Sequence, residues 1–169
     1  MNYAANGVDL AKFTDVIGSK YCYTYKTVNS VSTHAVETVS KKNGSETTTY
    51  QTLTYGYDAC GNTTSSTLSS PTVTGVVSST ASYIESGNFL SSVTDSLGGM
   101  TAYGYDSAKL LKYVENANSR RTGYLYDSRN RNTAVFLDLD EDGIPDSNEA
   151  NVQYSYTNNR LTGIVTDAT

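Results

Sequence analysis

An acidic stretch late in the chain carries the side chains best suited to chemistry. Residues 138–149 read Asp-Leu-Asp-Glu-Asp-Gly-Ile-Pro-Asp-Ser-Asn-Glu, so with Asp138 as position 1 side-chain oxygens fall at positions 1, 3, 5, 9 and 12, and glycine falls at position 6. Ca²⁺ takes six to eight oxygen ligands, and loops with this alternation supply them, adding the backbone carbonyl of position 7. The spacing predicts a calcium site whose ligands are Asp138, Asp140, Asp142, Asp146, Glu149 and the carbonyl oxygen of Ile144.

The acidic stretch has a second interpretation, which stays open at this point. Pro145 occupies position 8 and no helical pattern flanks the stretch, so it is not an EF-hand. A long hairpin tip can also be acidic for solubility alone. Against that, carboxylates this close repel one another when no ion lies between them. Zinc is disfavoured, because His34 is the sole histidine and hard carboxylates suit calcium or magnesium.

Catalysis finds little support elsewhere in the sequence. A serine triad or a cysteine dyad would require His34, which lies in an ordinary strand context, Ser32–Val36, with no partner to orient its ring. The paired carboxylates have the spacing of a metal cage, and nothing marks a substrate pocket. We therefore expect a structural His34, no enzyme activity, and calcium as the single cofactor.

A recurring Tyr-x-Tyr pattern must build the elements that position the loop. Tyr103-Gly104-Tyr105-Asp106 is nearly repeated at Tyr55-Gly56-Tyr57-Asp58 and at Tyr124-Leu125-Tyr126-Asp127. Residues two apart in a strand share a face, so each copy places two rings on one side of a sheet. The following Asp favours a turn, because its carboxylate accepts a hydrogen bond from the backbone two residues on. Each copy is a predicted strand that ends in a turn.

The residues before each copy repeat at fixed offsets. Leu10, Phe13, Thr14, Asp15 and Gly18 recur 80 positions later as Leu90, Val93, Thr94, Asp95 and Gly98. The glycine precedes the second tyrosine by 7 residues in both copies, since 25 − 18 and 105 − 98 are both 7. Tyr105 and Tyr126 are 21 residues apart, and periods of this size indicate stacked arrays of one supersecondary unit.

This pattern resembles the tyrosine-aspartate repeat of the Rhs family, whose unit is Leu-x-x-Val-Thr-Asp, Gly, then Tyr-x-Tyr-Asp-x-x-Gly-Arg. The likeness covers nearly the whole chain. At the position of the last family glycine, one copy has Gly61, a second has Asn130 and a third has Lys109. Glycine and asparagine tolerate the positive φ of this position, and lysine tolerates it poorly. We therefore expect the turn after Tyr105 to differ. The Asp-Gly-Ile-Pro-Asp wording of the acidic stretch, in turn, resembles the calcium repeats of thrombospondin type 3.

The Rhs resemblance implies β-hairpins that spiral into a hollow shell, as in bacterial toxins and animal cell-surface receptors. The expected fold is all-β, a single array over residues 1–169 in a curved or spiralling sheet. Its units are expected near residues 1–25, 26–57, 58–83, 84–105, 106–126 and 127–169, with 138–149 as an insert in the last unit. The unit 26–57 and the stretch 63–82 are predicted to hold enlarged hairpins.

Composition and charge narrow the function classes. The chain has 15 Tyr and no Trp, and its many Thr favour strands. A net charge of −5 argues against nucleic-acid binding, which usually needs a basic stripe. No apolar run approaches the roughly 20 residues that span a bilayer. No signal peptide stands before the first unit, so we expect a piece of an exported protein, extracellular or at the cell surface. Cys22 and Cys60 lack the spacing of a disulfide framework.

Two functions remain in view. The first is a structural repeat module in the shell of a larger exported bacterial protein, a polymorphic toxin or a wall-associated protein, in which tyrosines pack between hairpins. Its partners would be neighbouring repeats of that protein, or other copies of the chain that pair with open edge strands. The second is a calcium-dependent adhesin or carbohydrate-binding module whose exposed tyrosines stack on glycans. Regular recurrence in every unit favours the first.

Overall fold

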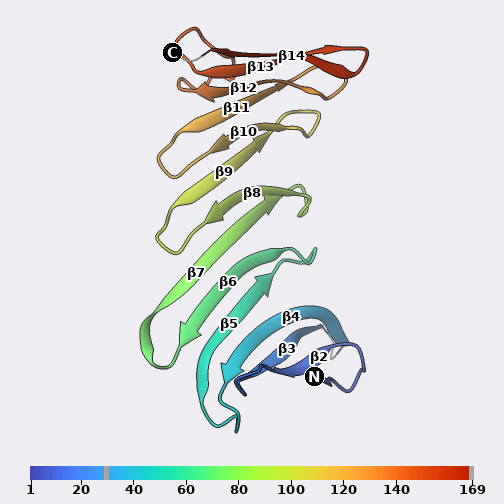
Figure 1. The fold of residues 1–169 in the computed structure, drawn as a ribbon, viewed down its shortest axis with the longest axis vertical. Helices are drawn as coiled ribbons and strands as arrows, with labels where there is room; N and C mark the ends of the chain where they lie inside the picture. Colours follow the sequence, from blue (N-terminus) through green and yellow to red (C-terminus); the bar gives the residue numbers. More distant parts are fainter. Residues whose placement is uncertain (29–30, 168–169) are drawn as a thin grey trace. The chain divides into compact units, whose positions relative to one another are not determined.

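The computed structural model describes residues 1–28 and 31–167 and confirms the all-β prediction (Figure 1). Within this described part, the strands are β1 (Asn2–Tyr3), β2 (Leu10–Thr14), β3 (Lys20–Val28), β4 (Val31–Lys42), β5 (Thr49–Tyr57), β6 (Thr63–Ser70), β7 (Val73–Ile84), β8 (Phe89–Thr94), β9 (Met100–Tyr105), β10 (Leu111–Glu115), β11 (Arg121–Tyr126), β12 (Asn132–Asp138), β13 (Asn151–Thr157) and β14 (Arg160–Asp167).

The strands form an antiparallel meander. They divide into two compact units, one of residues 1–89 with 95–97 and one of residues 90–94 with 98 onward. The strand order is β1 to β7 in the first unit and β8 to β14 in the second, so sheet neighbours are sequence neighbours. The enlarged hairpins expected in 26–57 and in 63–82 are present as β4–β5 and β6–β7. Residues 29, 30, 168 and 169 of the expected array lie outside the described residues.

The second tyrosine of each repeat ties its strand to the start of the preceding one. The hydroxyls of Tyr25, Tyr105 and Tyr126 donate to the carbonyl oxygens of Leu10, Leu90 and Leu111 at 3.0, 2.9 and 3.0 Å, across the same separation of 15 residues. Equivalent bonds run from Tyr57 to Val36, from Tyr83 to Thr63 and from Tyr156 to Asn132, at 2.7, 3.1 and 2.8 Å. The repeat predicted from residue offsets is therefore a repeat of one hydrogen bond.

The turns after these strands share one construction, in which a carboxylate or amide oxygen collects backbone N–H groups. Asp58 Oδ1 accepts from the N–H groups of Cys60 and Asn62, both at 2.9 Å. The same two offsets recur at Asp15, Asn116 and Asp127. The residue three places after the acid has positive φ each time, including Gly18 at 86° and Gly61 at 91°.

The expectation that the turn after Tyr105 differs is wrong. Lys109 occupies the left-handed region with φ of 66°, its N–H donates to Asp106 O at 3.0 Å, and Asp106 Oδ1 accepts from Leu110 N at 2.9 Å. Left-handed backbone costs a non-glycine residue about 1–2 kcal/mol. The hydrogen bonds of the turn offset that cost, so Lys109 adopts the conformation that glycine adopts in other copies.

In the second unit, aromatic rings of two strands lie over glycines of the strand that precedes each of them. A Cβ built on Gly104 would overlap the ring of Tyr113, and one built on Gly123 would overlap the ring of Phe136. Both pairs face each other directly in the strand register. Of the described apolar side chains, only Ala134 and Phe136 are buried, at 4% and 2% exposure. The core of this unit therefore centres on β12, the strand that leads into the acidic loop.

Candidate metal centre

The acidic loop begins at the last residue of β12 and closes on itself before β13. The N–H of Leu137 donates to the carbonyl oxygen of Ala150 at 3.0 Å, which holds the two ends of the loop together. Asp138 and Glu149, the first and last acids of the loop, are almost fully buried at 3% and 1% exposure. The β12–β13 ladder thus positions two buried carboxylates at the base of an exposed tip.

Three of the carboxylates converge. One carboxylate oxygen each from Asp138, Asp140 and Glu149 lies within 4.8 Å of the other two, close enough to hold a metal ion. Gly143 has φ of 79°, the conformation for which glycine was expected at the sharp turn. The loop therefore brings together positions 1, 3 and 12 of the predicted ligand set.

Backbone N–H groups orient these acids. Glu149 Oε1 accepts from Leu139 N at 2.6 Å and its Oε2 from Asp146 N at 3.0 Å, so this carboxylate bridges both ends of the loop. Asp140 Oδ1 accepts from Asp142 N at 3.3 Å, and Asp142 Oδ1 from Ile144 N at 2.7 Å. Each aspartate uses one oxygen in this way, which leaves its second oxygen for another partner.

Residues 138–149 include Asp and Glu side chains but no Lys, Arg or His, so the negative charge of the loop is not offset within it. Burial, then the charges of Asp140, Asp142 and Glu149, raise the pKa of Asp146. Arg121 Nη2 lies 2.9 Å from Glu141 Oε2 and 2.8 Å from Glu115 Oε2, so its charge is shared outside the converging acids. An additional cation at the convergence would relieve this repulsion.

The residues present fit a hard divalent ion. Buried carboxylates are normally paired or bound to a metal, and Asp138 and Glu149 have no ion pair with a basic residue among the described residues. Asp142, Ile144 and Asp146 lie on the same loop but outside the converging trio, and their role as ligands stays a prediction.

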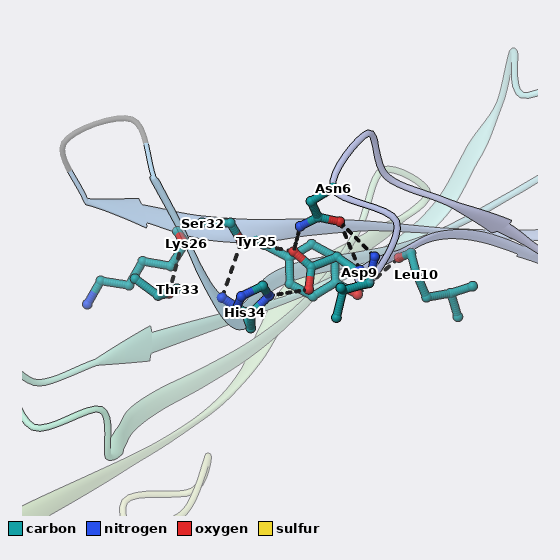
Figure 2. Close-up of polar contacts among 9 residues, drawn as sticks. Asn6, Asp9, Leu10, Tyr25, Lys26, Ser32, Thr33 and His34 are labelled. Atoms are coloured by element: carbon teal, nitrogen blue, oxygen red, sulfur yellow. Dashed lines mark hydrogen bonds and ion pairs between the residues drawn. The ribbon is translucent and has the colours of Figure 1, made fainter.

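A second polar cluster, which the sequence did not indicate, surrounds Asp9 (Figure 2). Asp9 is 6% exposed and accepts from His34 Nδ1 at 2.7 Å, Ser32 Oγ at 2.9 Å and Asn6 Nδ2 at 2.6 Å. The hydrogen bond from His34 holds the pKa of Asp9 below its usual value, Asn6 and Ser32 add to this, and burial opposes it.

This cluster corrects one expectation about His34. The ring has an orienting carboxylate after all, 25 residues away in sequence, and the backbone of His34 has φ of 62° within β4. Ser32 donates its hydroxyl to the same carboxylate, which fastens the Asn6–Asp9 turn to β4 (Figure 2). Asp9, Ser32 and His34 therefore stabilise the contact between the Asn6–Asp9 turn and β4. No short-range motif predicts them, because the pairing depends on how β2, β3 and β4 stack.

The cysteines are free thiols. Cys60 Sγ donates to Ser86 O at 2.7 Å, and Cys22 Sγ lies 4.0 Å from Glu46 Oε2. In the part of the chain that the structure describes, no helix has the length and apolar character needed to cross a membrane.

Among known proteins, this chain is similar in fold to part of a solved toxin structure. No family model matches the chain, and no curated protein matches it. The structure of the Photorhabdus luminescens Tc holotoxin pore with a mutated TccC3 is 15% identical, with a TM-score of 0.54 over 99% of this chain and 11% of that chain.

Two crystal structures that contain TcdB2 and TccC3 are 14% and 13% identical over 97% and 99% of this chain, with TM-scores of 0.34 and 0.35. The chain spans 11% of the length of each. At this level of identity the holotoxin shares the fold, so this chain has the antiparallel β-meander of one section of the Tc holotoxin pore structure.

Proposed function

We propose that this chain is a structural module of a larger exported bacterial protein, in which hairpin repeats build a shell or scaffold around or beside an active part. The observation that carries this proposal is the tyrosine tie, the same hydroxyl-to-carbonyl bond at the same 15-residue separation in three repeats. Residues placed this regularly serve packing in each unit. The likeness to the Tc holotoxin supports the same assignment.

The open faces of the sheet support an assembly role. Apolar side chains that would be covered in an isolated globular domain are exposed, among them Val76 at 59%, Val77 at 60% and Ile164 at 58%. Such surfaces mark contacts with further protein. Its partners would be neighbouring repeats of the parent protein or other copies of the chain, and its place would be outside the cell.

Excision of one repeat tests the scaffold proposal. Deleting residues 106–126 removes β10 and β11 and joins Tyr105 to Asp127, which restores the Tyr-Asp junction. Ala102 then takes the place of Gly123 opposite Phe136, so the variant also carries Ala102→Gly to leave room for the ring. We expect an unchanged antiparallel β circular dichroism spectrum and cooperative melting. Loss of the β spectrum in this variant, but not in Ala102→Gly alone, would contradict a modular scaffold.

We further propose that residues 138–149 bind calcium as a structural ion, with Asp138, Asp140, Asp142, Asp146, Glu149 and the Ile144 carbonyl as ligands. The converging trio and the crowded charge at Asp146 support it. The ion would supply the positive charge that the loop lacks and would hold β12 and β13 together at their ends.

Calorimetric titration tests the ion. Chelator-stripped protein should release or absorb heat on addition of calcium, and Asp140→Ala with Glu149→Ala should abolish the signal. Asp127→Ala is the matched control, because it removes a carboxylate from a turn on the other end of β12 and should leave the calcium heat intact. The absence of any calcium heat at millimolar ion would leave the loop as an acidic turn.

A further inference from the structure

Two asparagine–glycine pairs lie in turns of the first unit that are built differently. They are Asn6-Gly7 and Asn43-Gly44, the two places in the sequence where glycine follows asparagine. The glycine nitrogen of such a pair can attack the amide carbon of the asparagine side chain, because glycine has no Cβ to obstruct the approach. The attack releases ammonia, and asparagine is accordingly a thermolabile residue. In a folded chain its rate depends on what holds the two reacting groups.

The first turn holds both groups (Figure 2). Asn6 Nδ2 donates to Asp9 Oδ2 at 2.6 Å, and Asn6 Oδ1 accepts from the N–H groups of Val8 and Asp9 at 3.1 and 3.0 Å. The N–H of Gly7 donates to the carbonyl oxygen of Ala4 at 2.9 Å, so the attacking nitrogen is engaged too. The amide nitrogen that would leave meets a carboxylate, which has no proton to give it. Asn6 is therefore held against the reaction although it is exposed.

The second turn leaves the attacking nitrogen free. Among residues 1–28 and 31–167, no group accepts a hydrogen bond from the N–H of Gly44, and Gly44 is exposed. Asn43 Oδ1 accepts from the N–H of Thr48 at 3.1 Å. Because a backbone N–H only donates, this bond identifies the oxygen of the Asn43 amide and places its nitrogen on the other side.

Two hydroxyl groups lie beside that amide nitrogen. Asn43 Nδ2 is 3.0 Å from Ser45 Oγ and 2.9 Å from Thr47 Oγ1, and the two hydroxyl oxygens are 3.1 Å apart. These distances lie within the reach of about 2.6–3.2 Å that proton transfer from a general acid requires. A hydroxyl rotates and is both donor and acceptor, so either one can turn its proton toward the nitrogen as it leaves.

An aspartate in place of Asn43 fits this turn. As in the repeat turns, the residue three places on, Glu46, has positive φ of 63° and donates its N–H to the first carbonyl oxygen, here that of Asn43, at 3.0 Å. The corresponding first residue is an aspartate in the turns that begin at Asp15, Asp58, Asp106 and Asp127. A carboxylate in place of Asn6 would instead lie against the carboxylate of Asp9 and repel it.

We propose that Asn43 is a site of spontaneous deamidation in the folded protein and that Asn6 is not. The Gly44 nitrogen loses its proton to solvent base and bonds to Asn43 Cγ. The bond from Cγ to Nδ2 then breaks, and ammonia leaves with a proton delivered through the hydroxyl of Ser45 or Thr47, which solvent restores. Water opens the succinimide at Cγ to give aspartate, or at the main-chain carbonyl to give isoaspartate. One neutral amide becomes a carboxylate, so the net charge changes from −5 to −6.

Incubation of the intact protein at mildly alkaline pH, followed by mass spectrometry of its peptides, measures amide loss at both sites in one sample. We expect loss at Asn43 to be at least about tenfold faster than at Asn6, because opening the Asn6 turn breaks hydrogen bonds and about 1.4 kcal/mol is tenfold. In concentrated urea the difference should vanish, since both sites are then Asn-Gly in an unfolded chain.

Removing the two hydroxyls tests the proton delivery. Ser45→Ala with Thr47→Val should slow the loss at Asn43 roughly fivefold, which corresponds to about 1 kcal/mol of transition-state stabilisation. Ser66→Ala with Ser79→Ala is the matched control, because it removes another pair of facing hydroxyls, 2.8 Å apart, and should leave the rate at Asn43 unchanged. The far-ultraviolet circular dichroism of each variant checks that it remains folded.

Substitution by the product residue tests the fit. Asn43→Asp should leave the melting temperature unchanged, and Asn6→Asp should lower it. Equal rates at the two sites in the folded protein, or loss at Asn43 only in urea, would overturn the proposal. An unchanged rate in the folded Ser45→Ala, Thr47→Val variant would overturn the proton delivery, and an equal decrease in melting temperature in both aspartate variants would contradict the fit of the product.

Discussion

Two acidic turns stand at the two ends of β12 and use their carboxylates in opposite ways. Before the strand, Asp127 receives N–H groups from Arg129 and Arg131 at 2.8 and 3.1 Å and the guanidinium Nε of Arg131 at 2.7 Å. The hydrogen bond from the Arg131 side chain is the main cause that lowers the pKa of Asp127 to about 2. After the strand, Asp146 has a raised pKa, through burial first and then the charge of neighbouring acids.

The difference shows what a turn of this fold needs. One carboxylate is satisfied by its own backbone and one arginine, so the Asp127 turn is complete within the chain. The loop that starts at Asp138 gathers Asp138, Asp140 and Glu149 with no basic side chain among them, a cluster that could hold a metal ion. A buried or crowded carboxylate without compensation shifts its pKa upward.

The largest expected effect comes from the strand that the two turns share. Phe136 is 2% exposed and lies on Gly123, so Phe136→Ala should lower the free energy of unfolding by about 3–5 kcal/mol through lost burial and a cavity. Urea unfolding measures it, with hydrogen exchange to follow amides 128–131 and 139–149 separately. The amides of both turns should lose hydrogen-exchange protection together. Phe136→Leu is the milder control. If the amides of either turn kept their protection in Phe136→Ala, the two turns would not depend on the packing of β12.

The next effect separates the turns. Calcium at 100 times its dissociation constant should add about 2.7 kcal/mol to the free energy of unfolding, if the unfolded chain does not bind it. Part of this will appear as local ordering of the loop. Thermal melts with and without chelator measure the first, and hydrogen exchange the second. The amides of 128–131 should not respond. An equal calcium shift in Asp140→Ala with Glu149→Ala would show that the ion binds elsewhere.

Two Asp→Asn substitutions, each of which removes one negative charge, should change the melting temperature in opposite directions when calcium is absent. Asp127→Asn removes the charge that Arg131 pairs with and should lower the melting temperature. Asp140→Asn keeps the oxygen that accepts from Asp142 N but removes one charge from the crowded acids, so it should raise the melting temperature slightly and weaken calcium binding about tenfold. Differential scanning fluorimetry compares the two. A decrease in both variants would mean that repulsion in the loop is negligible.

The smallest effects are those of pH, and they too run in opposite directions. Asp127 has a lowered folded pKa of about 2, so its contribution is present above the unfolded value near 4 and is lost as pH falls toward 2. Asp146 has a raised folded pKa, so acidification from neutral pH through that value should stabilise the calcium-free loop. Hydrogen exchange with correction for intrinsic rates follows both turns. Parallel loss of protection in both turns would contradict the raised pKa.

The spacing of residues along the chain predicted much of this fold, because each repeat is built from residues that are close in sequence. The tyrosine offsets predicted the strands and the equivalent tyrosines, and the acid spacing predicted which loop gathers Asp138, Asp140 and Glu149. Contacts between hairpins were not predictable. Glu46 accepts from Lys12 and Lys20, which are 34 and 26 residues away and lower its pKa to about 2.

The intrinsic backbone preference of lysine led to a wrong prediction for the turn after Tyr105. The propensity of Lys109 disfavours positive φ, yet the hydrogen bonds that Asp106 forms outweigh about 1–2 kcal/mol of backbone strain. The Asp9 cluster escaped detection because its histidine and its carboxylate become neighbours only after three strands have stacked.

The tyrosine tie has a consequence for how the chain reaches its final state. Each hydroxyl closes on a carbonyl 15 residues earlier in three repeats, and strands pair with their immediate successors in each unit. Closing such short spans loses little chain entropy, and proteins rich in local contacts fold fast. A ribosome or a secretion channel that delivers the chain from its amino end would therefore release one finished repeat at a time, with little exposed strand edge waiting for distant sequence.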